Sequence, residues 1–250
     1  MKSYYEKHRE DSNELVVRRN DAPAYPMHFH ANVEIFIVKR GEGKVLLGGK
    51  METVQSGQVL VIDSYEEHGY YPMKEGESDC AIVVIPFQFL REIGKTEGRI
   101  EKPIITDEIL CSRLLSIVDE YLLPANGEEV KRFAVGLLWA ILAENLRFTK
   151  EKTQGESALI RQILIYIQEN YKGEVTRKKI AKELGYAEGH ISRVFHKYLK
   201  VGISEYVNKL RLLYVESQKQ AGDKRKIIEL IYEAGFSSQQ TYYRVKAKFA

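Results

Sequence analysis

The stretch Ile180–Phe195 reads IAKELGYAEGHISRVF, and the stretch Ile228–Val245 repeats its pattern as IELIYEAGFSSQQTYYRV. In each stretch an apolar helical stripe leads to a glycine and an aromatic residue, and a second amphipathic segment with an arginine follows. A helix, a tight turn at glycine and a second helix form the helix-turn-helix pattern, which can place its second helix in the major groove of DNA. Two such units in tandem indicate a DNA-reading domain far more strongly than one unit does.

The charge of the chain is distributed unevenly and supports this interpretation. Residues 157–250 hold 18 Lys and Arg against 9 Asp and Glu, whereas the other residues hold 20 against 26. A basic part joined to an acidic part indicates a polyanion-binding module attached to a domain with another task. A length of 250 residues is enough for two domains, each with its own hydrophobic core.

Apolar runs and cysteines indicate the compartment. No uninterrupted apolar run approaches the length of a membrane span, and residues 1–11 lack the apolar centre of a signal peptide. We therefore expect a cytoplasmic protein that does not associate with membranes. Cys80 and Cys111 lie far apart and lack the spacing of metal ligands, so we expect both to be reduced and buried.

Residues 1–105 are predicted to form an antiparallel β-barrel. Short β-branched runs are separated there by glycine turns, which is typical of antiparallel sandwiches and barrels. The runs are Val33–Val38, Lys44–Leu47, Val59–Ile62 and Cys80–Ile85.

Residues 106–150 are predicted to form a helical hairpin, because apolar residues recur there at three- and four-residue spacing around a break at Pro124. Its second helix carries a stripe that can pack on the barrel or on a second subunit, and a homodimer is expected. The stripe consists of Phe133, Leu137, Ala140, Ile141 and Glu144. The polar residues 151–157 predict a linker, and residues 158–250 predict an all-helical domain. The predicted fold class is thus α+β and multidomain.

The segments LGYAEGHISRVFHKY, SEYVNKLRL and EAGFSSQQTYYRV occur in this order and resemble the DNA-binding domain of AraC/XylS-type transcriptional regulators. The resemblance covers residues 158–250 and implies two helix-turn-helix units on adjacent major grooves of double-stranded DNA. Carried over by position, it assigns base reading to Gly189, Ser192, Arg193, Gln239, Gln240 and Arg244. Arg can bond guanine and Gln can bond adenine bidentately, and lysines such as Lys224 suit phosphate contacts.

Departures from the family pattern, Ala187 and Lys246 among them, predict DNA binding that is weaker or that depends on dimerisation or a partner. Ala187 stands where the family usually has a helix-capping Ser, and Lys246 stands where it has a core Phe.

A second resemblance covers roughly residues 20–90. His28, His30, Glu34 and Gly41 follow the spacing H-x-H-x₃-E-x₆-G of the first cupin motif, and His68 lies where the second motif has a histidine. It implies a barrel in which His28, His30, Glu34 and His68 converge as ligands for a divalent metal such as Mn, Fe, Ni or Zn.

The same pocket has an alternative use that needs no cofactor. AraC-type regulators often carry a cupin-like domain that binds a sugar or another small effector without a metal. The candidate effector-binding residues are His30, Glu34, His68, Tyr70 and Tyr71.

We therefore expect a DNA-binding transcriptional regulator that responds to a small-molecule effector, with a carbohydrate as one candidate, and that has no enzymatic activity. Two rivals stay open from the sequence. One is a metal-dependent cupin enzyme with a vestigial helix-turn-helix domain, and the other is a regulator that responds to a protein partner.

Overall fold

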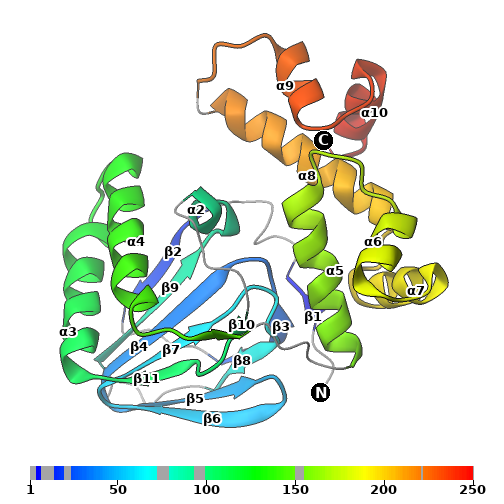
Figure 1. Ribbon diagram of the computed structural model, residues 1–250. Coiled ribbons are helices and arrows are strands. Elements are labelled where there is room, and N and C mark those ends of the chain that lie inside the picture. Colours follow the sequence, from blue (N-terminus) through cyan, green and yellow to red (C-terminus); the bar gives the residue numbers. More distant parts are fainter. Residues whose placement is uncertain are drawn as a thin grey trace. The chain divides into compact units, whose positions relative to one another are not determined.

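The computed structural model describes residues 4–6, 14–19, 24–71, 79–92, 99–149, 155–220 and 222–249. The chain divides into two compact units, Met1–Lys152 and Thr153–Ala250 (Figure 1). The described strands all lie in the first unit, and the second unit is helical.

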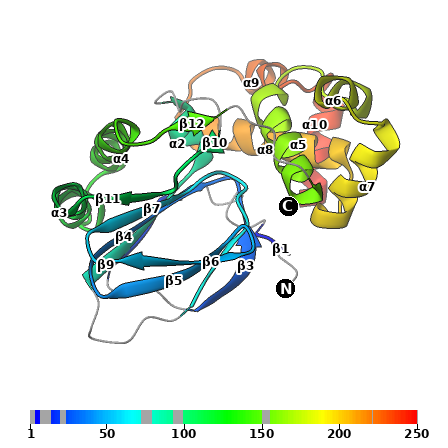
Figure 2. The same cartoon turned by 60° about the horizontal axis from the view of Figure 1, so that its bottom comes forward.

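Two five-stranded sheets face each other in the first unit (Figure 2). In spatial order, the strands of one sheet are β1 (Tyr4–Tyr5), β3 (Tyr25–Phe29), β8 (His68–Tyr70), β5 (Glu42–Leu47) and β6 (Lys50–Gln55). Those of the other are β11 (Ile104–Thr106), β7 (Gln58–Ile62), β4 (Val33–Arg40), β9 (Asp79–Ile85) and β2 (Val16–Arg19). A two-stranded sheet joins β10 (Arg99–Ile100) to β12 (Phe148–Thr149).

Among the described strands, neighbours pair antiparallel, as predicted, with one exception. Strand β1 runs parallel to β3, and Tyr4 and Tyr5 lie opposite His28 and Phe29. Strand β3 in turn pairs antiparallel with β8, so that His28 lies opposite His68. The exception matters for the site because β1 approaches the histidines of the cupin motif from the edge of the sheet.

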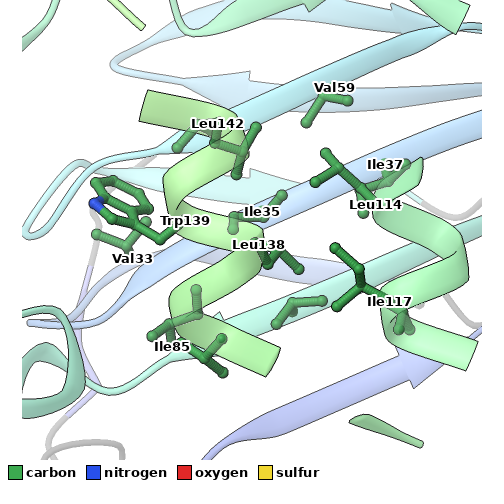
Figure 3. Close-up of a cluster of buried hydrophobic side chains, with 14 of the residues drawn as sticks. Val33, Ile35, Ile37, Val59, Ile85, Leu114, Ile117, Leu138, Trp139 and Leu142 are labelled. Carbon is green, nitrogen blue, oxygen red and sulfur yellow. The ribbon is translucent and has the colours of Figure 1, made fainter. Parts of the chain in front are cut away.

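Strand β4 explains why VEIFIV is an unbroken apolar run. Successive side chains of a strand point to opposite faces, and both faces of β4 are covered. Phe36 and Val38 belong to the core between the two sheets. Ile35 and Ile37 belong to a second core on the opposite face of that sheet, under the helices, as Figure 3 shows.

The predicted helical hairpin is confirmed. Helix α3 (Glu108–Ile117) begins at Asp107, whose carboxylate accepts the N–H of Leu110 at 2.9 Å, and it continues into a π-helical turn, η1 (Val118–Leu122). Helix α4 (Glu128–Ala143) follows, and a short helix, α2 (Phe87–Glu92), comes after β9. Leu114, Leu138, Trp139 and Leu142 pack on β4 (Figure 3).

The structure decides between the two alternatives for the stripe of α4, because a different face of this helix packs on the barrel. Helix α4 buries Ala134, Val135, Leu138, Trp139 and Leu142. Phe133 is 82% exposed and Leu137 is 51% exposed, so the predicted stripe lies mainly on the outside. Helix α4 has apolar residues on two faces, and the face with Trp139 is the one that fits the sheet.

The second unit contains two helix-turn-helix units, as predicted. Helices α6 (Arg177–Leu184) and α7 (Glu188–Leu199) form the first, and α9 (Ile227–Glu233) and α10 (Gln239–Phe249) form the second. Helix α8 (Ile203–Gln220) connects them, and α5 (Glu156–Asn170) packs on α6 and α7. Helix α5 begins at Glu156, so the last residues of the predicted linker 151–157 are helical, while residues 151–154 lie outside the described residues.

Among the described residues, no helix combines the length and apolarity that a membrane crossing requires. Cys80 and Cys111 are both free and buried, as predicted.

Candidate metal centre and nucleic-acid interface

The residues of the predicted metal site converge between the two sheets of the first unit. His28 lies on β3, His30 follows β3, Glu34 lies on β4 and His68 begins β8. Each of the four is at most 5% exposed. One ligand atom from each can be chosen such that all four atoms lie within 4.8 Å of one another.

Backbone carbonyls hold the three imidazoles in one orientation. A carbonyl oxygen only accepts hydrogen bonds, so the Nδ1 atom of each ring carries a proton, and in the neutral ring Nε2 keeps its lone pair. The Nδ1 distances are 2.9 Å from His28 to Pro26 O, 3.2 Å from His30 to Asn32 O and 2.8 Å from His68 to Glu66 O. Such outer hydrogen bonds fix the tautomer of histidines that bind metals through Nε2.

The Nε2 atoms and Glu34 form the interior of the cluster. Glu34 Oε2 lies 3.3 Å from Nε2 of His30 and 3.4 Å from Nε2 of His68. These contacts satisfy the distance for an ion pair, but neither Nε2 atom has a well-aligned hydrogen bond. Nitrogen lone pairs and a carboxylate oxygen therefore face one another in a buried space, and a cation between them would satisfy all of them.

Burial and the neighbouring charges shift the pKa of each group. Burial, reinforced by His68 and His30, lowers the pKa of His28 to about 3. Burial also lowers the pKa of His30, against the opposing effect of Glu34. Burial opposes a charge on His68 as well, but Glu34 overrides it and raises the pKa of His68. Burial would raise the pKa of Glu34, yet contacts with His30 and His68 hold it well below its usual range. Glu34 is thus a carboxylate, the form that binds metals.

A small cavity adjoins the cluster. It has a volume of about 30 Å³, and its lining includes His28, Glu34, Tyr25 and Tyr70. This volume is close to that of one water molecule in the liquid, so the cavity suits water beside a bound ion. Three imidazoles and a carboxylate suit Mn, Fe, Ni or Zn, and the donors present fit such an ion.

The predicted effector residues do not all meet. His30, Glu34, His68 and Tyr70 are buried together, and burial with the Glu34 charge raises the pKa of Tyr70 well above its usual value. Tyr71 is 43% exposed and lines an apolar surface hollow together with Tyr70, Met27 and Leu46, whereas the three histidines and Glu34 do not line it. Adjacent residues of an extended chain point to opposite faces, which separates Tyr71 from the cluster.

Glu6 lies beside the cluster although no motif in the sequence points to it. Its side chain is buried, with Oε2 3.7 Å from Nε2 of His28, and it accepts a hydrogen bond from the hydroxyl of Tyr25. Nothing in the polar N-terminal sequence distinguishes Glu6 from its neighbours, because only the pairing of β1 with β3 brings it to the histidines.

In the first helix-turn-helix unit, the candidate base contacts lie at the start of α7. Gly189 and Arg193 are exposed. The hydroxyl of Ser192 is buried without a hydrogen-bond partner, so Ser192 is withdrawn from the base-reading candidates. The N-cap residue Ala187 makes no side-chain hydrogen bond, as its sequence predicts.

In the second unit, Gln239, Gln240 and Arg244 are all exposed on α10, and Lys224 is exposed ahead of α9. Ser238 caps the helix by accepting the N–H of Thr241 at 3.2 Å. Tyr243, which the sequence analysis did not single out, is 52% exposed. It lies three residues after Gln240, and helical spacing therefore places both side chains on one face.

Lys246 occupies the position where a core Phe is expected, and its charged amino group is not buried. Its Nζ lies 2.9 Å from Oε1 of Glu216, which also accepts a hydrogen bond from the Tyr242 hydroxyl at 2.7 Å. Tyr242 is fully buried and belongs to the hydrophobic core of the second unit.

Comparison with known proteins supports both halves of this description. A family model described as a cupin domain matches residues 17–86. The activator RhaS of Mannheimia succiniciproducens is 22% identical over 87% of this chain and 83% of its own length. The activator AarP of Providencia stuartii is 27% identical over 39% of this chain and 71% of its own. Both are described as helix-turn-helix transcriptional activators. The chain is therefore similar to AraC-type transcriptional regulators, and part of it matches a cupin domain.

A solved structure gives a more distant similarity. ToxT from Vibrio cholerae O395 aligns with a TM-score of 0.41 and 14% identity over 93% of this chain and 91% of that one. The residues of the cupin match include His28, His30, Glu34 and His68.

Proposed function

We propose that this chain is a sequence-specific DNA-binding regulator whose cupin domain responds to a first-row divalent transition-metal ion. The observation that carries the proposal is the buried cluster of His28, His30, Glu34 and His68, with Nε2 lone pairs and a carboxylate turned toward one another. His28, His30 and His68 would hold the ion through Nε2, and Glu34 would hold it through a carboxylate oxygen. The bound ion would supply a charge change inside the barrel.

The size of the cavity favours an ion over a carbohydrate as the ligand at this cluster. A volume of about 30 Å³ accommodates a water molecule, whereas sites for organic ligands are commonly ten times larger.

DNA reading is assigned mainly to the second helix-turn-helix unit. Gln240, Tyr243 and Arg244 share an exposed face of α10, where Arg can bond guanine and Gln adenine. The first unit contributes Arg193, with an exposed Gly189 that offers no side chain. Lys224 is assigned to a phosphate, which positions the protein without reading sequence.

The outer face of α4 is assigned to a homodimer. An antiparallel pair of α4 helices centred on Leu137 sets Phe133 of one copy against Ile141 of the other. The same pairing brings Lys131 near Glu144, so opposite charges flank the apolar contact. A dimer suits a regulator that reads paired DNA half-sites.

The test begins with a binding site selected by the full-length protein from random duplex DNA. Fluorescence anisotropy then compares this site with a scrambled duplex at the same salt concentration, because phosphate affinity depends steeply on salt. A preference of about a thousandfold is expected. Zn²⁺, Mn²⁺ or Ni²⁺ is expected to change the specific affinity about 5- to 150-fold relative to chelator, and Glu34→Gln should abolish that change.

Each rival predicts a different result. Metal occupancy without any sequence preference on DNA would support the enzyme, and sequence preference without any response to ions would leave a sensor for another ligand or for a protein. Either result would contradict the proposal.

A further inference from the structure

Helix α8 contributes to the cores of both helix-turn-helix units (Figure 1). Near its start, Tyr206 is buried, and its ring lies nearly edge-on to that of Phe195 on α7, with centroids 5.6 Å apart. Farther along, Leu212 and Val215 belong to a core that also contains Tyr242 of α10. One shared helix sets a common axis, but it leaves each unit able to rock about that axis. A fixed geometry therefore needs a second attachment.

The turn of residues 171–173, which follows α5, provides this attachment through Arg211. Arg211 lies on α8 and donates from Nε to the carbonyl of Tyr171 and from Nη2 to that of Gly173, both at 2.7 Å. A guanidinium presents its donors in a rigid planar fork, so bonds to two carbonyls fix the turn in position and direction. Because α5 packs on α6 and α7, the turn belongs to the first helix-turn-helix unit.

The second helix-turn-helix unit packs its glycine turn on the same residues. A Cβ atom at Gly235 would lie 2.3 Å from the carbonyl oxygen of Lys172 and 3.0 Å from Nε of Arg211. The backbone of Gly235 thus lies directly against the carbonyl between the two that Arg211 binds. Only glycine permits this approach, because every other residue carries a Cβ atom.

Glu233, the last residue of α9, adds charged contacts at the same place. Its carboxylate accepts hydrogen bonds from Nζ of Lys172 at 3.0 Å and from the hydroxyl of Tyr214. Hydrogen bonds from Tyr214, Lys172 and Arg225 lower the pKa of Glu233 to about 2, so this carboxylate is charged at neutral pH. The side chains of Lys172 and Glu233 are 34% and 36% exposed, and ion pairs in such positions contribute little stability.

The contacts of the 171–173 turn with Arg211, Glu233 and Gly235 form a joint that holds α7 and α10 in one relative position. One base pair added between two DNA elements moves them about 3.4 Å apart and turns them by about 34–36° around the DNA axis. Two reading helices that are held rigidly therefore reach both of their elements at one spacing. Loosely joined helices accept neighbouring spacings as well.

We propose that Arg211 is a positioning residue that sets the spacing of the two DNA elements that this chain accepts. The proposal rests on the DNA-reading function above and adds a residue that lies outside both reading helices. Without the two bonds of Arg211, the 171–173 turn keeps only its packing and the partly exposed contacts of Glu233. The second helix-turn-helix unit then rotates more freely relative to the first.

The first measurement uses the full-length protein and its selected DNA site. Loss of discrimination in Arg193→Ala and in Arg244→Ala locates the base pairs that each reading helix contacts. Duplexes with one base pair inserted between these elements, or removed, are then compared with the original by fluorescence anisotropy at one salt concentration. We expect the altered spacing to lower the affinity about 100-fold for the unaltered protein and about 10-fold or less for Arg211→Met.

Two further variants serve as controls. Lys219→Met removes a positive charge from an exposed position of α8, about two turns beyond Arg211. It should weaken binding to all duplexes alike and leave the ratio of their affinities unchanged. Arg211→Lys keeps the charge but loses the planar fork, so its ratio should lie between those of the unaltered protein and Arg211→Met.

The second measurement needs no DNA. Spin labels on His196→Cys of α7 and Ala247→Cys of α10, both exposed positions, report the distance between the reading helices by electron–electron double resonance. Cys80 and Cys111 are buried, and the protein without the two new cysteines gives the background. We expect one narrow distance distribution when Arg211 is present and a broader one with Arg211→Met.

The outcomes separate the role of Arg211 from the DNA-reading function. If either the affinity ratio or the distance distribution of Arg211→Met equals that of the protein with Arg211, the role of Arg211 is overturned and sequence-specific binding stands. A selected site that α10 reads alone would overturn it as well. An unaltered protein without any sequence preference would overturn the DNA-reading function itself.

Discussion

Three glycines in the second unit differ in how strongly the backbone conformation and the neighbouring atoms require glycine. Gly235 has φ +93°, and a Cβ atom there would lie 2.3 Å from the carbonyl oxygen of Lys172. Gly185 has φ +76° with nothing within 4 Å, and helical Gly189 also has open space around it. A side chain at Gly235 is disfavoured by both backbone conformation and contact. One at Gly185 is disfavoured by conformation alone, and one at Gly189 by neither.

The effect of alanine substitution on the free energy of unfolding should follow that order. Gly235→Ala is expected to lower the free energy of unfolding by at least about 3 kcal/mol, and Gly185→Ala by about 1–2 kcal/mol. Gly189→Ala should raise it by about 0.5–1 kcal/mol, because alanine loses less backbone entropy in a helix. Urea denaturation measures all three, and a similar cost at Gly185 and Gly235 would contradict the steric argument.

Residues on the DNA-reading face should separate into two classes. Gln240→Ala and Arg244→Ala are expected to lower discrimination between cognate and scrambled DNA, with about 1–3 kcal/mol lost for Arg244. Lys224→Ala should weaken both complexes alike. Ser192→Ala removes a buried hydroxyl and should leave both affinities unchanged. Anisotropy titrations at one salt concentration measure these effects, and equal losses on both DNAs for all variants would reject the assignment.

At the scale of single elements, α4 shows how one helix serves two surfaces. Its inner face contributes Leu138 and Trp139 to the core of the first unit, and its outer face leaves Phe133 and Leu137 exposed. An apolar face of this kind is costly in water unless a second surface covers it.

Substitutions on the two faces of α4 should therefore affect different properties, the oligomeric state for the outer face and the free energy of unfolding for the inner face. Phe133→Asp and Leu137→Asp are expected to convert the dimer to a monomer while the free energy of unfolding of the monomer changes little. Leu138→Ala should lower that free energy by about 2–5 kcal/mol. Light scattering after size exclusion, with thermal unfolding beside it, distinguishes the cases; an unaltered protein that is monomeric at micromolar concentration would rule out the dimer.

At the scale of the whole molecule, the two units have separate cores, and the histidine cluster lies in only one of them. A ligand that binds the folded form stabilises the unit that contains its site. The effect of an ion on unfolding is thus a test of where the ion binds.

Calorimetry should show that effect in the first unit. At a Zn²⁺ concentration 100 times the Kd, the unit is expected to gain about 2.7 kcal/mol, and a chelator should reverse the gain. Residues 155–249 expressed alone should show no such gain, and neither should full-length Glu34→Gln. A gain of equal size in the isolated helical unit would place the ion elsewhere.

Local patterns in the sequence determined most of the fold. The repeated glycine turn predicted both helix-turn-helix units, and the spacing of apolar residues predicted the hairpin of α3 and α4. The cupin spacing predicted that His28, His30, Glu34 and His68 converge, and the structure brings them together. These predictions succeed because helical periodicity, turn chemistry and short motifs depend on residues that are close in sequence.

Tertiary structure alone decided three other features. It selected which apolar face of α4 packs on the sheet, it turned the Ser192 hydroxyl inward, and it placed Tyr71 at a surface hollow outside the histidine cluster. Above all it paired β1 with β3 and so buried Glu6 against His28. Pairing between strands distant in sequence depends on which surfaces meet in three dimensions, and a charged residue in a polar stretch carries no local signal of that pairing.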